Sequence, residues 1–364
     1  MTATSSLLLV GVGGAGARMA KRIVDSFPGD IRRLIVDSDA KSAQEDEGAA
    51  FALIGGERLA GKGSGGDVIT ARIATEESFA QIKRHLEGVS FAVIVTGLGG
   101  GTGCGATLSL LEEFTNLGIT SIVFATTPFS FEGEERHRNS RGSISMISER
   151  ANASFFLALD KLVGEADYVE EAMANAVDAL SSAVTLFWRL IEKPGYIHLD
   201  LERIRRLSLN AGRGRFATVR VSGDNRTYHA LQELTSSALL ADGSHDVRSI
   251  VCGILAGDDL RLAEIGELAS GVRAAYGDKA AFEIATVNDE SSFGGELCVV
   301  LMLFESKVKE EHLAKTSRSR RAKSAKGVLA KPATGFPDGS DRTIINGEDL
   351  DVPTYARMGL TLDL

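Results

Sequence analysis

Short apolar runs alternate with glycine-rich or polar segments through the first half of the chain. Four of these runs have the length and composition of buried strands: residues 6–12, 34–36, 91–95 and 119–126. Three segments that follow such runs have the composition of helices: residues 17–26, 68–86 and 108–117. This repeated unit of strand, loop and helix is typical of a parallel sheet covered by helices on both faces.

The second half follows a different pattern. Residues 168–193 contain neither glycine nor proline and predict one long helix. Its apolar side chains recur at spacings of three and four, as a buried stripe requires: Met173, Val177, Leu180, Val184, Phe187 and Ile191. Four later runs predict strands: residues 218–223, 250–255, 281–287 and 297–304. With helices at residues 228–240 and 261–275, they predict a second, α+β domain.

Three glycine-rich loops follow predicted strands in the sequence of the first half. They are residues 11–16 (GVGGAG), 55–67 (GGERLAGKGSGGD) and 95–107 (VTGLGGGTGCGAT). Glycine-rich backbone that leads into a helix N-terminus presents N–H groups to an anion. The carboxyl ends of parallel strands share one edge of the sheet, where ligands bind. The sequence therefore predicts a phosphate site built from all three loops.

The first loop also allows another interpretation. Its spacing, Gly11-x-Gly13-x-x-Gly16, matches the dinucleotide fingerprint, and Asp37 stands where that fingerprint has its ribose contact. An NAD(P)-dependent oxidoreductase is therefore an alternative. Two further glycine loops would crowd the pyrophosphate of a dinucleotide, whereas a triphosphate has more anionic oxygens for several loops to hold. This comparison favours a nucleoside triphosphate.

Charge and cysteine content narrow the class of protein. The net charge of −9 argues against general nucleic-acid binding, and the three cysteines show no metal spacing. No apolar run approaches the roughly 20 residues of a membrane helix, so we expect a cytoplasmic protein. Residues 307–332 hold nine Lys and Arg against two Glu, which is typical of a solvated linker. Contact of this linker with an anionic membrane surface, or with the acidic body of a neighbouring copy, is the alternative.

Together these motifs resemble the tubulin/FtsZ superfamily, and within it the bacterial cell-division GTPase FtsZ and its divergent relatives. Residues 99–105 (GGGTGCG) resemble the highly specific GGGTGxG phosphate signature of the family. Further segments resemble other family motifs: residues 11–16, 37–40 (DSDA), 65–67 (GGD), 128–133 (PFSFEG) and 256–262 (AGDDLRL). The likeness extends over about residues 6–305 and includes the tail at 349–355, so the implied fold is tubulin/FtsZ-like.

The resemblance implies a site for GTP or GDP with Mg²⁺. The backbone from Gly99 to Thr102 would hold the α- and β-phosphates, while Asp178 would read guanine by accepting from N1–H and N2–H₂. Mg²⁺ would be held largely by the phosphates and water, so no protein metal ligand is predicted. The predicted nucleotide-binding residues are Gly13, Gly14, Asp37, Gly65, Gly66, Gly99, Gly100, Gly101, Thr102, Gly103, Glu132, Arg136 and Asp178.

The resemblance also implies head-to-tail filaments in which the next subunit completes the hydrolytic site with acidic residues. FtsZ typically reads NLDFAD in this loop, and residues 198–203 of this chain read HLDLER. Asp200 keeps the first acid, Arg203 replaces the second, and Glu202 stands one position earlier. We therefore predict Asp200, Glu202 and Arg203 as the catalytic group. Arg203 can stabilise phosphoryl charge but cannot act as a base, so slow hydrolysis is expected.

Other departures from FtsZ indicate a divergent paralogue, because Arg18 and Val177 replace asparagines. The expected partners are other copies of the chain, another FtsZ-family protein, and an adaptor that binds residues 349–357. A co-assembling, nucleotide-binding scaffold with little GTPase activity is a further alternative. The predicted organisation is a GTP-binding domain (1–167), a central helix (168–193), a polymer-contact loop and connection (194–213), an α+β domain (214–305), a basic disordered linker (306–347) and a partner-binding peptide (348–364).

Overall fold

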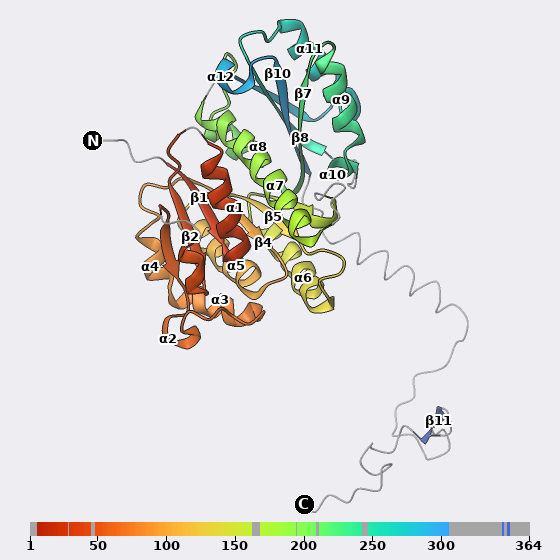
Figure 1. Ribbon diagram of the computed structural model, residues 1–364. Helices are drawn as coiled ribbons and strands as arrows, with labels where there is room; N and C mark the ends of the chain where they lie inside the picture. Colours follow the sequence, from red (N-terminus) through yellow and green to blue (C-terminus); the bar gives the residue numbers. More distant parts are fainter. Residues whose placement is uncertain are drawn as a thin grey trace, which may run out of the picture. The chain divides into compact units, whose positions relative to one another are not determined.

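The computed structural model describes residues 6–27, 29–44, 48–161, 168–193, 195–208, 211–241 and 247–305, with the backbone of residues 344–345 and 348–349. The chain forms two compact units, residues 1–307 and 308–364 (Figure 1). In the second unit, β11 (Ile344–Ile345) pairs with β12 (Glu348–Asp349). The rest of the predicted linker and tail lies outside the described residues. None of the described helices combines the length and apolar character that a membrane crossing requires.

One ten-stranded sheet runs through the whole first unit. Its strands, in spatial order, are β3 (Ala50–Leu53), β2 (Arg33–Asp37), β1 (Leu7–Val12), β4 (Phe91–Gly97), β5 (Thr120–Thr127), β6 (Ala153–Ala158), β7 (Gly212–Ser222), β10 (Glu296–Glu305), β8 (Val247–Ala256) and β9 (Ala281–Asn288). The first six strands are parallel, and β10 is antiparallel to both β7 and β8. The parallel arrangement predicted for the first half is confirmed.

The two halves of the sheet meet at a short seam. Strands β6 and β7 pair in parallel at three positions, from Ala153 with Gly212 to Phe155 with Gly214. Through this pairing the strands of the predicted second, α+β domain continue the sheet of the first half. A pairing of three residues leaves no pattern in the sequence that distinguishes it from two separate sheets.

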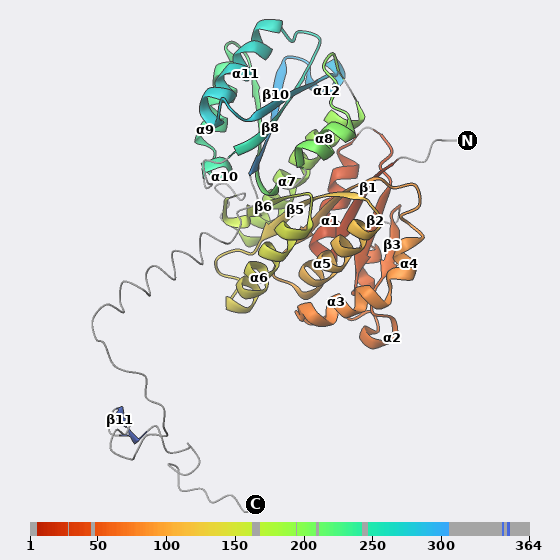
Figure 2. The same cartoon turned by 180° about the vertical axis from the view of Figure 1, so that it is seen from behind.

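Helices cover both faces of the sheet (Figures 1 and 2). On the first half, α1 (Gly13–Asp25) and α7 (Val169–Glu192) cover one face. The opposite face is covered by α3 (Val68–Glu77), α4 (Phe79–Lys83), α5 (Gly101–Asn116) and α6 (Glu134–Arg150). On the second half, α9 (Arg226–Ser236), α10 (Ala238–Ala241) and α11 (Leu262–Tyr276) pack on the face away from α7. Shorter segments complete the list: α2 (Gly56–Leu59), α8 (Leu201–Ser208), α12 (Glu290–Phe293), and the 3₁₀ turns η1 (Ala40–Gln44) and η2 (Leu159–Lys161).

The predicted central helix is present as α7, and its apolar stripe packs against both halves of the sheet. Leu180, Val184, Phe187 and Ile191 are buried in one core cluster with side chains of β1, β4, β8 and β10. The predicted helix at 68–86 is broken at Ser78 into α3 and α4. Helix α6 was not predicted, because only three of its residues are buried and two of these are serines.

Candidate functional site

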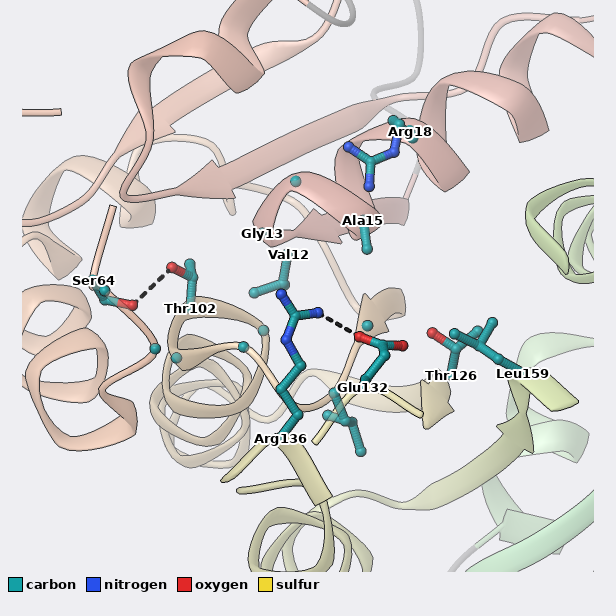
Figure 3. Close-up of a pocket in the computed structure, with 18 residues that line it drawn as sticks. Val12, Gly13, Ala15, Arg18, Ser64, Thr102, Thr126, Glu132, Arg136 and Leu159 are labelled. Atoms are coloured by element: carbon teal, nitrogen blue, oxygen red, sulfur yellow. Dashed lines mark hydrogen bonds and ion pairs between the residues drawn. The ribbon is translucent and has the colours of Figure 1, made fainter. Parts of the chain in front are cut away.

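The site lies where the connections of the sheet change direction. Strands β2 and β3 lie on one side of β1, whereas β4, β5 and β6 lie on the other. The loops after β1 and β4 therefore diverge at the carboxyl edge, at the switch point where ligands bind in such sheets. A cavity of about 310 Å³ occupies this place, with walls from all three glycine loops (Figure 3).

The helices that begin at this cavity start inside their glycine loops. Helix α1 begins at Gly13 and α5 at Gly101, four and seven residues before the predicted starts at 17 and 108. Neither helix has a side-chain cap or an acidic residue in its first turn. Their first N–H groups therefore have no intrahelical acceptor, and the positive ends of two helix dipoles meet at the cavity. This arrangement suits phosphate.

Close packing accounts for part of the glycine content. A Cβ on Gly101 would lie 2.3 Å from Ser64 Oγ, and one on Gly103 would lie 2.1 Å from the carbonyl oxygen of Gly97. These two glycines let α5 approach its neighbours. By contrast, a Cβ on Gly100 would meet nothing within 4 Å. We therefore assign part of this motif to packing and part to the open cavity.

Hydrogen bonds fix the second and third glycine loops around the cavity. Thr102 Oγ1 lies 2.6 Å from Ser38 Oγ and 3.4 Å from Ser64 Oγ. Asn139 Nδ2 donates to the carbonyl oxygens of Gly66 at 3.1 Å and of Gly99 at 3.2 Å. Each bond joins segments that are far apart in sequence. These two loops are therefore held in place by side chains of α5, α6 and the segment after β2.

Asp37 does not line the cavity but supports this network through its bond with Ser38. Its carboxylate accepts from the backbone N–H of Ser38 at 2.7 Å and from the hydroxyl of Ser42 at 2.5 Å. Burial raises the pKa of Asp37 above its usual 3.8, against the lowering effect of these bonds. The position predicted for a ribose contact is thus occupied by a buried residue that orients Ser38.

Glu132 of the PFSFEG loop and Arg136 of α6 form the opposite wall. Glu132 and Arg136 pair with each other, and the Glu132 carboxylate also accepts from the N–H of Phe129 at 2.9 Å (Figure 3). Their charges cancel. Arg18 is the remaining charged side chain of the cavity lining, so the lining carries a net positive charge.

A second cavity of about 450 Å³ lies between α1 and α7. It is lined by Arg18, Lys21, Arg22, Asp25, Ala174, Val177 and Asp178. Arg18 lines both cavities, so the two adjoin at its side chain. Asp178, the predicted guanine reader, belongs to this second cavity, which we call the base-side groove. Its carboxylate accepts two hydrogen bonds from Arg22.

The structure brings together ten of the thirteen predicted nucleotide-binding residues in the first cavity. They are Gly13, Gly14, Gly65, Gly66, Gly100, Gly101, Thr102, Gly103, Glu132 and Arg136. Gly99 is not among the lining residues, and a Cβ on it would lie 3.2 Å from Arg136 Cβ. Eight further lining residues were not predicted: Val12, Ala15, Arg18, Ser64, Gly97, Leu98, Thr126 and Leu159. Thr126 could have been found, because it stands at the carboxyl end of a predicted strand.

The predicted catalytic residues lie elsewhere. Hydrogen bonds from Ser181 to Met19 and from Thr185 to Ile23 show that α7 runs parallel to α1, away from the first cavity. Helix α8 follows the far end of α7 (Figure 1). The cavity of a given copy is therefore separated from its own α8 by the length of α7.

Each of these three residues has a partner around α8. Asp200 Oδ1 accepts from the N–H of Arg203 at 2.6 Å and so caps the helix. The guanidinium of Arg203 pairs with Glu283 on β9. Glu202 pairs with Arg205 at 3.4 Å. Arg203 is thus tied to the sheet of its own chain.

The architecture is that of a doubly wound α/β protein with a phosphate-type cavity, and comparisons with known proteins agree. A model of the tubulin/FtsZ family GTPase domain matches residues 6–167. The cell division protein FtsZ of Pseudomonas putida is 30% identical over 285 residues, which is 77% of this chain and 72% of the relative. That of Pseudomonas aeruginosa is 26% identical over 97% of this chain and 89% of the relative.

Solved structures show the same fold. An FtsZ dimer of M. jannaschii superposes with a TM-score of 0.77 at 23% identity, covering 82% of this chain and 88% of that one. CetZ2 of Haloferax volcanii, in a GTPγS-bound protofilament, gives a TM-score of 0.71 at 18% identity, covering 87% and 98%. The chain belongs to the tubulin/FtsZ family, as a divergent member.

Proposed function

We propose that this chain binds GTP, assembles head to tail into filaments and hydrolyses GTP where successive subunits meet. The observation that carries the proposal is the cavity at the switch point, walled by three glycine loops that include GGGTGCG. Relatives named cell division protein FtsZ support a role in cell division or a related cytoskeletal task. The protofilament of CetZ2 with GTPγS supports self-association and a guanine nucleotide.

The cavity fits a triphosphate by its donors. The first-turn N–H groups of α1 and α5 and the hydroxyls of Thr102 and Ser64 would donate to phosphate oxygens. Arg18 adds the uncompensated positive charge. Glu132 is the acidic side chain of the lining and already pairs with Arg136, so Mg²⁺ would be held by the phosphates and water. The bound ion would neutralise phosphate charge.

Hydrolysis requires a second copy in this proposal. Because α8 follows the far end of α7, it can meet a nucleotide only in a neighbouring subunit. The second carboxylate oxygen of Asp200 would then position water against the γ-phosphate. Arg203 carries no basic lone pair, so turnover is slower than with two acids.

Light scattering and phosphate release test this function together. Purified protein should scatter more light after GTP and Mg²⁺ are added, and phosphate release per subunit should rise with protein concentration because the site needs two subunits. Asp200→Asn keeps the helix cap but removes the charge, so turnover should fall about 100-fold with GTP affinity unchanged. NAD serves as the control ligand in equilibrium dialysis and should not bind. Absence of GTP binding and assembly would refute the proposal, and unchanged turnover in Asp200→Asn would remove Asp200 from the catalytic role.

A second candidate is a scaffold that binds nucleotide and co-assembles with another family member but hydrolyses little. The replacement of the second acid by Arg203, paired with Glu283, favours it. Arg203→Asp restores the acid, and a large gain in turnover would support the scaffold. A relative with both acids, mixed with this chain, should then raise phosphate release above the sum of the separate proteins. An unchanged rate in both measurements favours the self-sufficient GTPase.

The remaining predictions from the sequence stay proposals. We infer an adaptor-binding role for residues 349–357 and a cytoplasmic location. Any membrane contact would be indirect or would run through the basic linker. The outer bounds of the linker and peptide, 306–347 and 348–364, fall largely outside the described residues.

A further inference from the structure

The base-side groove contains an ion pair with unusual geometry for a surface contact. Arg22 Nε donates to Asp178 Oδ1 at 2.7 Å, and Arg22 Nη2 donates to Asp178 Oδ2 at 3.1 Å. The two bonds run side by side, so both carboxylate oxygens are engaged by one planar group. Ser181 and Thr185, on the following turns of α7, bond to the backbone of α1 and fix the spacing of the two helices.

This pairing imitates recognition of guanine. The edge of the guanidinium presents two parallel N–H donors, and the N1–H and N2–H₂ edge of guanine presents the same pair to a carboxylate. Adenine carries a donor and an acceptor on the corresponding edge, so it cannot satisfy both oxygens. Asp178 is thus held in the orientation that guanine requires, by a side chain of the same protein.

We propose that Arg22 is an internal competitor of guanine, which occupies the place of the guanine edge on Asp178 until a guanine nucleotide displaces it. The inference rests on the proposed function, because it assumes that the nucleotide extends from the first cavity into the groove. Arg18 lines both cavities and marks this path. Only a base with two parallel donors replaces both bonds that the displacement breaks.

The groove contains another partner for the displaced side chain of Arg22. Asp25 lies three residues after Arg22 and lines the same groove, so the guanidinium can move to this carboxylate. The cost of displacement is small, because the side chains of Arg22 and Asp178 are 54% and 47% exposed. An exposed pair of this kind corresponds to an effect on affinity of about two- to fivefold.

The direction of the effect separates this inference from simple charge attraction. Removing a cation beside an anionic ligand should weaken binding, whereas removing a competitor of the base should strengthen it. The experiment measures affinities of the full chain for GTP, GDP and ATP by calorimetry in wild type, Arg22→Met and Lys21→Met. Lys21 lines the same groove without the Asp178 pair, so it is the matched control.

We expect Arg22→Met to bind GTP and GDP about two- to fivefold more tightly, with no gain for ATP. Lys21→Met should show no gain, and Arg22→Met should have no effect on affinity in an Asp178→Asn background. Arg22→Gln provides a second neutral variant if the first is unstable. Unchanged or weaker guanine-nucleotide binding, or an equal gain for ATP, would overturn the inference. Failure of the wild type to bind GTP would overturn the proposed function itself, and the inference with it.

Discussion

Arg18 shows how one side chain can change the character of a site without changing the fold. It lies on α1, two residues beyond the glycine loop (Figure 3), and lines both cavities. Because the charges of Glu132 and Arg136 cancel each other, Arg18 determines the net charge of the first cavity. An asparagine, which the family resemblance leads us to expect there, offers hydrogen bonds but no charge.

Arg18→Asn should therefore weaken GTP and GDP binding about three- to tenfold, the range of one partly exposed charge-assisted contact. The loss should shrink as salt is raised, because screening already weakens the wild-type contact. Titrations of fluorescent GDP at two salt concentrations would measure both effects. Arg84→Asn, which removes an exposed arginine from the C-cap of α4, is the control. Equal affinity of Arg18→Asn and wild type would exclude a nucleotide contact.

At the scale of elements, a buried ion pair joins α9 to α11 over the second half of the sheet. Arg226 donates to Glu264 at 2.7 Å and 3.0 Å, and their side chains are 5% and 7% exposed. Arg226 also donates to Asp259, whose side chain is 50% exposed. The hydrogen bond from Arg226 is the main cause that lowers the pKa of Glu264 below its usual 4.5. The motif AGDDLRL, residues 256–262, thus leads into α11, the helix that carries the buried carboxylate of Glu264.

Glu264→Gln should destabilise the protein by about 3–5 kcal/mol, because Arg226 would keep a buried charge without its main counterion. Asp259→Asn removes an exposed partner of the same arginine and should cost at most about 1 kcal/mol. Urea unfolding measures both, and equal losses would contradict the buried-pair argument. Since the pKa of Glu264 is lowered on folding, its contribution is present above pH 4.5 and is lost as the pH falls through the folded pKa. The acid dependence of stability should therefore be shallower in Glu264→Gln.

At the scale of the whole first unit, the seam between β6 and β7 joins the two halves of the sheet. The first half carries the first cavity, and α8 packs against the second half. Phe155 on β6 stacks on Phe124 at 5.1 Å between ring centroids and contacts Phe216 and Phe304 across the seam. Gly214 on β7 stands opposite Phe155 in the register. A Cβ there would lie 2.6 Å from the Phe155 ring and 2.7 Å from the carbonyl oxygen of Leu303.

Gly214→Ala should therefore cost about 1–3 kcal/mol, because the buried ring and the neighbouring strand cannot both move away. Gly142→Ala is the control, since its Cβ on α6 would meet nothing within 4 Å. That substitution should stabilise by about 0.5–1 kcal/mol through helix propensity. Thermal unfolding of the three proteins measures the difference. A stable Gly214→Ala protein would mean that the seam is loosely packed.

The sequence alone determined the features that depend on local pattern. Apolar runs followed by glycine loops predicted the parallel sheet, because strand length, period and turn chemistry are read from neighbouring residues. The motif GGGTGCG predicted a phosphate site, and ten of its associated residues line one cavity. Helix α6 was missed because a polar surface helix leaves weak periodicity, and strand β6 was missed although its sequence, ASFFLA, is apolar apart from one serine.

The tertiary structure decided what depends on contacts between distant segments. Three residue pairs between β6 and β7 join the strands of the two predicted domains into one sheet. The burial of Asp37 behind Ser38, from whose N–H its carboxylate accepts, was likewise decided by the tertiary structure. The pairing of Asp178 with Arg22, 156 residues apart, and of Arg203 with Glu283, 80 apart, followed only from the packing of α1 on α7 and of α8 on β9. Such contacts depend on how whole helices and strands are buried against each other, so no local sequence pattern predicts them.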